Sequence, residues 1–236
     1  MQCVILAGGL GTRMRPLTDT CPKTLLPVAG RPFAYYQMHW LARQGVTDVV
    51  YSIGHHGKMI RSYWEREPSP VPWLRFVDEG DQLLGTGGAV RLACRQGVLQ
   101  DRFFVIYGDS FLPVEFRPIW QAFESSAMPA LMTVLRNRGQ WDRSNVRYHE
   151  GRVLVYDKRG GDDFEYIDYG LSVLRRRLFE NCETNPSDLA TLFHELSVTN
   201  QLAGFQVSER FYEIGSPEGF SAFERYLEGE QFPVTP

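Results

Sequence analysis

Short apolar runs alternate with stretches of helical period along the first half of this chain. The runs predict buried β-strands and lie at residues 3–7, 48–53, 74–77 and 103–107. Between the first two runs, apolar side chains recur at offsets of 3, 7 and 8 from Phe33. This spacing predicts one face of a helix that begins after Pro32 and ends at Gly45. A second helix is expected at residues 87–96. Strands joined by helices are typical of a largely parallel sheet covered on both faces.

The second half of the chain has a different pattern. Apolar runs crowd together at residues 130–135, 152–156, 167–174 and 203–207, with a helix from about Asp188 before the last of them. This crowding predicts an extension of the sheet with mixed strand directions rather than a repeat of the first half. A chain of 236 residues fits one domain. We therefore expect a single domain over residues 1–236, with an α/β, three-layer αβα, Rossmann-like fold and a mostly parallel mixed sheet.

Composition and charge exclude several classes of protein. With 43% hydrophobic and 22% charged residues, the chain lacks the biased composition of a disordered, collagenous or coiled-coil protein. Its net charge of −3 gives no overall positive field, so we expect no nucleic-acid partner. The four cysteines show no zinc-binding spacing and are expected to be reduced thiols. No apolar run approaches the length of a membrane span and the start lacks a signal peptide's basic region, so we expect a cytoplasmic protein without membrane association.

A glycine-rich loop directly follows the first predicted strand. It reads Leu6-Ala7-Gly8-Gly9-Leu10-Gly11-Thr12-Arg13-Met14-Arg15-Pro16. Glycines allow close backbone approach, so successive N–H groups can converge on phosphate oxygens. The loop is not a GxGxxG fingerprint, because the sixth residue from Gly9 is Met14, and no Gly-Lys-Ser/Thr follows to make a Walker A loop. Arg13, Arg15 and Lys23 form a cationic set that could neutralise a triphosphate, and a tight turn with solvated arginines is the alternative interpretation.

The complete loop resembles the signature of the sugar-1-phosphate nucleotidylyltransferases, in which LAGGxGTRxxPLT is followed by PK, here Pro22-Lys23. The resemblance continues through further motifs over nearly the whole chain. It implies a nucleotide-diphospho-sugar transferase fold with a nucleotide-binding part at about residues 1–110 and a sugar-binding part at about 111–236. It also implies that the loop surrounds the base and phosphates through Leu6, Ala7, Gly8, Gly9, Gly11, Thr12 and Arg13. Arg13 and Lys23 would act as catalytic residues that stabilise charge on the triphosphate.

A second glycine-rich segment, Leu84-Gly85-Thr86-Gly87-Gly88-Ala89, follows Glu79 between a predicted strand and a predicted helix. In the family, the matching segment lies against the base and ribose, so the resemblance implies nucleotide contacts for Glu79, Gly85 and Thr86. One extra residue separates Glu79 from Leu84, which leaves Gly80 as the alternative base-reading position. Taken alone, the segment also fits a strand-to-helix turn.

Two acidic positions are implied as metal ligands. Asp109 follows the run at 103–107, at a strand carboxyl end where open α/β sheets bind ligands. The family's aspartate at this position coordinates Mg²⁺ and makes Asp109 a catalytic residue, although a turn role is the alternative. Glu213 stands where the family usually has an Asp. A carboxylate one methylene longer can still reach Mg²⁺, which needs only one or two carboxylates besides waters and phosphates.

Four residues are candidates for the sugar phosphate. Lys158 ends a segment that resembles the family's E-K pair, whose lysine meets the sugar phosphate. Asp168 replaces an Asn that hydrogen-bonds sugar hydroxyls, and because a carboxylate can only accept, the hydroxyl pattern it binds is expected to differ. Tyr107 and Asn145 are further candidates, for which a core or loop role is the favoured interpretation from the sequence alone. Two of the three lysines in an arginine-rich chain, Lys23 and Lys158, thus match substrate positions.

The implied reaction is Mg²⁺-dependent transfer of a nucleotidyl group from a nucleoside triphosphate to a sugar 1-phosphate, with release of pyrophosphate. The sugar phosphate, with a second pKa of about 6, is already an anionic nucleophile near pH 7. The enzyme must therefore align two anions and stabilise charge. Within the family, segments such as Gly30-Arg31-Pro32-Phe33 look most like guanylyltransferases for manno-heptose or mannose 1-phosphate. The alternatives are a uridylyltransferase for N-acetylmuramate or hexose 1-phosphate and a catalytically silent sensing subunit, and both monomer and homodimer stay open.

Overall fold

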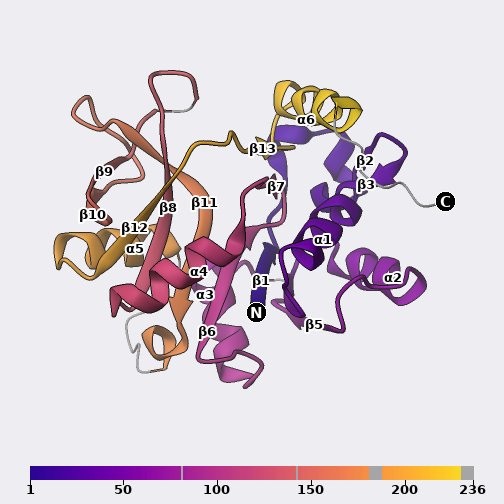
Figure 1. The fold of residues 1–236 in the computed structure, drawn as a ribbon. Coiled ribbons are helices and arrows are strands. Elements are labelled where there is room, and N and C mark those ends of the chain that lie inside the picture. Colours follow the sequence, from indigo (N-terminus) through magenta and orange to yellow (C-terminus); the bar gives the residue numbers. More distant parts are fainter. Residues whose placement is uncertain (81, 142, 181–187, 230–236) are drawn as a thin grey trace.

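In a computed structural model of the protein, residues 1–80, 82–141, 143–180 and 188–229 are described. Their main feature is a nine-stranded sheet with the order β5-β4-β1-β6-β11-β8-β12-β10-β9 (Figure 1). In chain order, its strands are β1 (Gln2–Ala7), β4 (Asp48–Ile53), β5 (Trp73–Asp78), β6 (Arg102–Tyr107), β8 (Ala130–Arg136), β9 (Val146–His149), β10 (Arg152–Tyr156), β11 (Tyr166–Arg175) and β12 (Leu202–Val207). Every run that the sequence predicts as a strand lies within one of these strands.

Helices cover both faces of the sheet. They are α1 (Phe33–Arg43), α2 (Gly57–Arg66), α3 (Gly85–Arg95), α4 (Phe116–Ser126), α5 (Leu189–Val198) and α6 (Pro217–Gly229). Side chains of α1, α2 and α4 share one hydrophobic core with the sheet, and those of α3 and α5 share a second core on the opposite face. The predicted three-layer αβα arrangement is confirmed.

Most strands of the sheet run in one direction. β5, β4, β1 and β6 are parallel neighbours. β11 is antiparallel to both β6 and β8, while β8 and β12 are again parallel. β10 is antiparallel to β12 and β9, so within the described ranges β11 and β10 alone oppose the other strands. The mostly parallel mixed sheet predicted from the sequence is therefore confirmed.

Neighbouring residues of the central strands belong to opposite cores. In β1, Cys3 and Ile5 lie in the core beneath α1, α2 and α4, whereas Val4 lies in the core beneath α3 and α5. In β6, Phe104 and Phe103 divide in the same way. Because side chains alternate along a strand, a strand covered on both faces needs apolar residues at successive positions. This requirement explains the unbroken apolar runs in the sequence.

A smaller cluster packs beside the main sheet. It contains two short strand pairs, β2 (Pro27–Val28) with β3 (Arg31–Pro32) and β7 (Ser110–Phe111) with β13 (Tyr212–Glu213). Phe223 of α6 packs against Phe111 and against Phe33 of α1, with ring centroids 5.0 and 5.1 Å apart. The last part of the described chain therefore returns to the first half, next to β7 (Figure 1).

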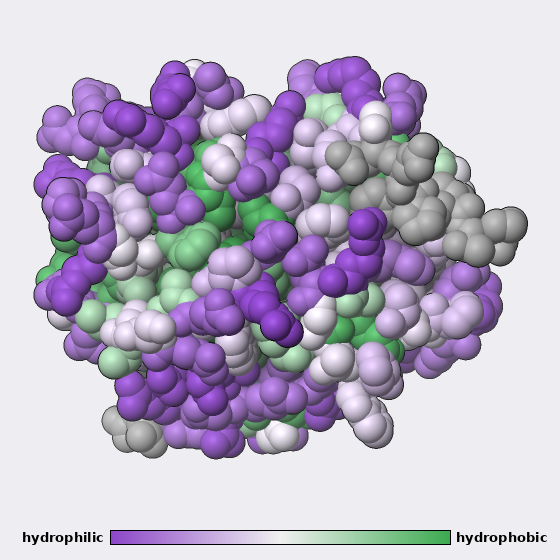
Figure 2. Space-filling model, viewed as in Figure 1, coloured by the Kyte–Doolittle hydropathy of each residue, from purple (hydrophilic) through white to green (hydrophobic). Residues whose placement is uncertain are grey.

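The surface is mainly hydrophilic in the view of Figure 2. Hydrophobic residues gather in the hollow between β8 and β11 on one side and the segment leading to β13 on the other. The ring of Phe211, in that segment, packs against Trp141 and Tyr169, with centroids 5.7 and 5.9 Å apart. None of the helices in the described ranges is both long and apolar enough to cross a membrane. Cys182, expected to be a reduced thiol, lies outside the described residues.

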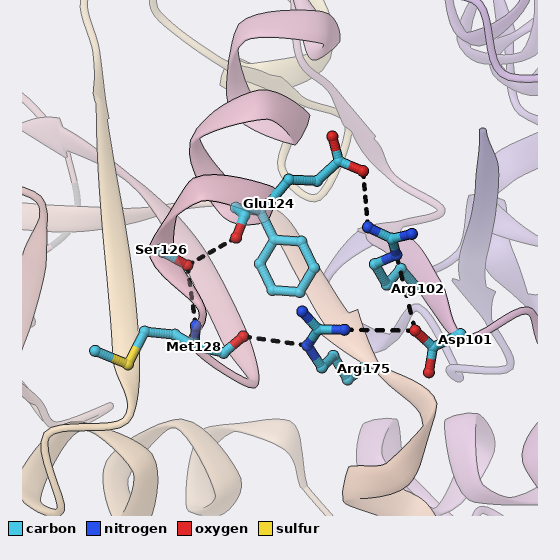
Figure 3. Close-up of polar contacts among 7 residues, drawn as sticks. Asp101, Arg102, Glu124, Ser126, Met128 and Arg175 are labelled. Atoms are coloured by element: carbon cyan, nitrogen blue, oxygen red, sulfur yellow. Dashed lines mark hydrogen bonds and ion pairs between the residues drawn. The ribbon is translucent and has the colours of Figure 1, made fainter.

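Ion pairs join the elements at the amino end of the sheet (Figure 3). Arg102, at the start of β6, pairs with Glu124 of α4 at 2.7 Å. Arg175, at the end of β11, pairs with Asp101 at 3.4 Å and donates to the Met128 carbonyl at 3.4 Å. This network fixes β6, β11 and α4 to one another at the end of the sheet opposite the predicted nucleotide loop.

A second amino-end network centres on the buried side chain of Asp48, at the start of β4. Its Oδ2 accepts hydrogen bonds from Gln2 Nε2 at 2.8 Å and Gln100 Nε2 at 3.1 Å and forms an ion pair with Arg75. Gln2 also donates to the Val98 carbonyl and accepts from the Gln100 N–H. The network joins β1, β4, β5 and the segment before β6.

Candidate functional site

A cavity of about 290 Å³ opens at the carboxyl ends of the parallel strands β1, β5 and β6. Its walls are the loops after these strands, the start of α3 and the segment around Lys23. Eleven residues predicted as site residues line it: Leu6, Ala7, Gly8, Gly9, Gly11, Lys23, Glu79, Gly85, Thr86, Tyr107 and Asp109. The fold thus brings together most of the predicted nucleotide-binding residues. Six other predicted residues do not line this cavity: Thr12, Arg13, Asn145, Lys158, Asp168 and Glu213.

The glycines after β1 form part of the cavity wall. A Cβ on Gly8 would lie 2.5 Å from Oε1 of Glu79, so a side chain there would force the Glu79 carboxylate to shift. Gly11 has φ of +63°, a conformation that favours glycine. A Cβ on Gly9 would meet no atom within 4 Å, so this residue leaves open space in the cavity wall. The loop therefore exposes its backbone to a ligand while keeping that space clear.

Glu79 presents its carboxylate to the cavity beside Gly8. Its Oε1 accepts from Ser52 Oγ at 3.1 Å and its Oε2 accepts from the Leu84 N–H at 3.2 Å. Burial raises the pKa of Glu79, and these two hydrogen bonds only partly offset that effect. Gly80 is exposed and does not line the cavity. Of the two alternatives left by the sequence, Glu79 is the one placed at the cavity.

Lys23 and Asp109 form an ion pair across the cavity. Lys23 Nζ lies 2.8 Å from Asp109 Oδ2, and the two side chains are 16% and 25% exposed. Asp109 follows β6 and Gly108, as expected from the sequence. Gln37 of α1, which no sequence pattern marks as functional, is buried and donates to the carbonyls of Tyr107 and Ser110, at 2.8 and 2.6 Å. Gln37 thereby fixes the turn that presents Asp109.

Glu213 and Arg13 lie beside this turn without lining the cavity. Glu213 pairs with Ser110 in the β7–β13 ladder, and the next residue, Ile214, donates its N–H to the Asp109 carbonyl at 2.9 Å. The exposed Arg13 lies along the same segment, since its Nη2 is 3.0 Å from the position of a Cβ on Gly215. The fold therefore brings the backbone of Asp109 beside the β13 segment that carries Glu213, and places Arg13 next to the same segment. No group of three or more metal-ligating side chains occurs in the described part of the chain.

Three of the four candidates for the sugar side, Tyr107, Asn145 and Asp168, meet at the bulge of β11. Tyr107 lines the cavity, and a Cβ on Gly170 of the bulge would lie 3.7 Å from its ring. Asp168 accepts from the Gly170 N–H at 2.9 Å, while its own N–H donates to Asn145 Oδ1 at 2.9 Å. Burial raises the pKa of Asp168 to about 6 despite the Gly170 hydrogen bond. Asn145 thus supports the bulge, and Asp168 carries a carboxylate held in an unfavourable environment.

Lys158 lies outside the cavity and is joined to it indirectly. Its Nζ is 2.6 Å from Oδ2 of Asp188, and Oδ1 of Asp188 accepts from Thr86 Oγ1 at 2.9 Å. The sequence predicted Asp188 only as the start of a helix. Its place before an apolar stretch indicates an N-cap, but no local pattern indicates its contacts with Thr86 and Lys158.

Comparisons with known proteins find similar sequences and a similar fold over nearly the whole chain. Residues 2–143 match the model of a family described as nucleotidyl transferase. The chain is 25% identical to the D-glycero-alpha-D-manno-heptose 1-phosphate guanylyltransferase of Aneurinibacillus thermoaerophilus over 97% of this chain and 99% of that protein. It is 26% identical to the mannose-1-phosphate guanyltransferase of Gibberella zeae over 93% of this chain, but spans 62% of that longer protein. The structure of HddC from Yersinia pseudotuberculosis complexed with GMP-PN has the same fold, with a TM-score of 0.80 at 24% identity over 96% of this chain and 99% of that chain.

Proposed function

The chain belongs to the nucleotidyl transferase family, and we propose that it transfers the guanylyl group of GTP to manno-heptose 1-phosphate or mannose 1-phosphate. One observation carries this proposal: a single cavity gathers a glycine-rich backbone, the Lys23–Asp109 pair and the Glu79 carboxylate. The similarity to a heptose 1-phosphate guanylyltransferase over nearly the full length of both chains supports the choice of substrates. We also propose that residues 1–110 form the nucleotide-binding part and residues 111–236 the sugar-binding part of one domain.

The chemistry of Glu79 supports guanine as the base. An ionised carboxylate can only accept hydrogen bonds. The Watson–Crick edge of guanine presents two adjacent donors, N1–H and the N2 amino group, which a carboxylate can accept together. Uracil presents a single N–H between two carbonyl oxygens, which a carboxylate would repel. Ser52 and the Leu84 N–H hold the Glu79 carboxylate in place.

We assign the triphosphate to the loop after β1, where the backbone N–H groups of a glycine-rich turn favour bound anions. Gly85 and Thr86, the first residues of α3, also line the cavity and would contact the base and ribose. Lys23 would bind the phosphates inside the cavity, and Arg13 would bind them from its exposed rim.

Mg²⁺ fits the two carboxylates Asp109 and Glu213. This ion uses one or two carboxylates together with waters and substrate phosphates, and this chain offers such a pair beside the predicted phosphate site. When bound, Mg²⁺ would neutralise charge on the triphosphate and on the departing pyrophosphate. Asp109, in the turn before β7, and Glu213, in β13, would hold it, and Gln37 would keep the Asp109 turn in position.

In the proposed reaction, an oxygen of the sugar 1-phosphate attacks the α-phosphorus of GTP. One P–O bond forms there, and the P–O bond to the pyrophosphate breaks. The protein supplies alignment and charge stabilisation rather than a nucleophile. Lys158 would bind the incoming phosphate, while Tyr107, Asn145 and Asp168 would form the sugar pocket.

Assays of pyrophosphate release with a panel of nucleoside triphosphates and sugar 1-phosphates test this proposal. We expect turnover with GTP and a manno-configured sugar 1-phosphate. Glu79→Gln should lower kcat/KM for GTP by about 10- to 100-fold, because an amide can accept from only one side of the guanine edge. Turnover with UTP and not GTP would contradict the choice of base. Binding of a nucleotide sugar without turnover of any pair would identify a catalytically silent subunit.

A further inference from the structure

The side chain of Asp188 bridges the cavity and Lys158. Its Oδ2 accepts from Lys158 Nζ at 2.6 Å, and its Oδ1 accepts from Thr86 Oγ1 at 2.9 Å. Thr86 lines the cavity at the start of α3, whereas Lys158 follows β10. One carboxylate therefore connects the proposed nucleotide side to the lysine proposed for the sugar phosphate.

The start of α5 holds this carboxylate in place. Asp188 is the N-cap of α5, and its Oδ1 accepts from the Ala190 N–H at 3.0 Å. Thr86 Oγ1 in turn accepts from the Leu189 N–H at 2.8 Å. The first turn of α5 and the first turn of α3 are thus joined by hydrogen bonds in both directions, and Asp188 has little freedom to move.

Helix α5 also fixes the end of β10. Ser197 Oγ accepts from the Tyr156 N–H at 3.0 Å, and His194 Nδ1 lies 2.7 Å from the Tyr156 carbonyl oxygen. Tyr156 is the last residue of β10 and precedes Lys158 by two positions. The same helix therefore sets the position of the Lys158 backbone and of the carboxylate that holds its ammonium group.

Asp188 is ionised at neutral pH. Burial alone would raise its pKa, but hydrogen bonds from Lys158, the Ala190 N–H and Thr86 outweigh this effect and lower the pKa below its ordinary value. The Lys158 side chain is 66% exposed. Lys158 is therefore a solvent-exposed side chain whose ammonium group is held by one fixed carboxylate, that of Asp188.

We propose that Asp188 is the positioning residue for Lys158, holding its ammonium group beside Thr86 before the sugar phosphate binds. This proposal rests on the proposed function. An ammonium group has three donors, so Lys158 can keep its bond to Asp188 and still donate to a phosphate. A free lysine side chain would lose rotational freedom when the phosphate binds. Because Asp188 already restricts the Lys158 side chain, less rotational freedom is lost when the phosphate binds. Asp188 itself makes no contact with the substrate.

The test is Asp188→Asn, measured as KM and kcat for each substrate. Asparagine is as good an N-cap as aspartate and can keep the bonds to Thr86 and Ala190, so the change removes mainly the charge that holds Lys158. We expect KM for the sugar 1-phosphate to rise about two- to fivefold, the size of an exposed ion pair, with KM for GTP unchanged. Asp162→Asn is the matched control, because Asp162 forms an exposed pair with Arg143 instead. This control should change neither constant.

A double-mutant cycle with Lys158→Met separates positioning from a merely structural role. Lys158→Met alone should raise KM for the sugar 1-phosphate about tenfold or more, and Asp188→Asn should add nothing in that background. An equal rise in both backgrounds, no rise at all, or a fall in KM on Asp188→Asn overturns the positioning role. If Lys158→Met itself leaves KM unchanged, the proposed role of Lys158 fails, and the role of Asp188 fails with it. Thermal denaturation of each variant checks that the fold is retained.

Discussion

The two ends of the nine-stranded sheet use their polar residues in opposite ways. At the amino end, Asp48 accepts from Gln2, Gln100 and Arg75, all of them partners within the chain. At the carboxyl end, Asp168 accepts one backbone hydrogen bond, from Gly170, and burial raises its pKa to about 6. The buried Asp48 at the amino end thus has three donors, whereas the half-buried Asp168 at the carboxyl end has one.

This difference separates residues that stabilise the fold from residues that are kept for a ligand. A buried charge is destabilising unless it is paired or well hydrogen-bonded. Carboxylates with a raised pKa therefore mark places where the protein gives up stability, and such places cluster at functional sites. Glu79 and Asp168, whose pKa values are raised, both lie at the cavity end of the sheet. We expect substitutions at the two ends to have opposite effects on activity and stability.

The largest expected effect is a loss of activity on changing Lys23 to Met. The change removes the charge proposed to bind the triphosphate and keeps the aliphatic stem. We expect kcat/KM to fall by about 10²- to 10³-fold, as for other groups that stabilise developing charge. The free energy of unfolding should change by less than about 1 kcal/mol, since Asp109 remains at a cavity open to water. Steady-state assays and urea denaturation measure the two quantities.

Lys58→Met is the control for this prediction. Lys58 is exposed on α2, away from the cavity, and has no proposed role. Its replacement should leave kcat/KM unchanged. A loss of activity in Lys23→Met that matches a loss of folded protein would contradict the separation between the two ends.

Asp48→Ala should have the next largest effect, and on stability alone. It leaves three donors without their shared acceptor at the buried start of β4. We expect the free energy of unfolding to fall by about 2 to 4 kcal/mol. The kcat/KM of the protein that remains folded should match the wild type, because the cavity lies at the other end of the sheet. Urea denaturation and active-site titration measure both.

Asp101→Asn is the control at the same end of the sheet. Asp101 pairs with Arg102 and Arg175, but its side chain is 62% exposed (Figure 3). We expect a loss below about 1 kcal/mol, as for exposed ion pairs. A loss equal to that of Asp48→Ala would show that burial and the number of donors do not decide the effect.

The sequence predicts the strands of this fold better than its helices. The run at 48–53 coincides with β4, which is buried along its whole length, and the run at 152–156 coincides with β10, in which exposed Arg152 and Leu154 flank the buried Val153. Helix α2 was not predicted, because Ile60 and Trp64 are its only large buried apolar residues and two residues make too short an apolar stripe. Helix α4 was not predicted either, although its buried Phe116, Ile119 and Phe123 recur at helical spacing.

The sequence also predicts site residues that belong to local motifs better than those that the fold brings together from distant parts of the chain. The loop after β1 and the Glu79 segment carry local glycine patterns, and both line the cavity. Asp168 reaches the neighbourhood of Tyr107 because β11 inserts between β6 and β8. Periodicity shows that a segment is a strand, but it does not say which strand lies beside it. The contact of Thr86 with Asp188, 102 residues away, has the same origin.

The smallest of the three effects is a gain in stability on changing Asp168 to Asn. The pKa of Asp168 rises from 3.8 to about 6 on folding, so the folded protein binds a proton more tightly than the unfolded chain. The contribution of this group to stability is complete below pH 3.8 and is lost as the pH rises to about 6. Asparagine has no proton to lose and can still accept from the Gly170 N–H. We therefore expect Asp168→Asn to be more stable than the wild type by about 1 to 2 kcal/mol at pH 7.5, with little difference near pH 4.

Urea denaturation at pH 4, 5, 6 and 7.5 measures this gain. The value of kcat/KM for the sugar 1-phosphate tests whether the Asp168 carboxylate contributes to activity. A more stable variant with a lower kcat/KM would place Asp168 among the residues that are held for a ligand at the expense of the fold. A variant that is less stable at pH 7.5 would mean that the ionised carboxylate stabilises β11. In that case Asp168 would resemble Asp48, and the contrast between the two ends of the sheet would not extend to this strand.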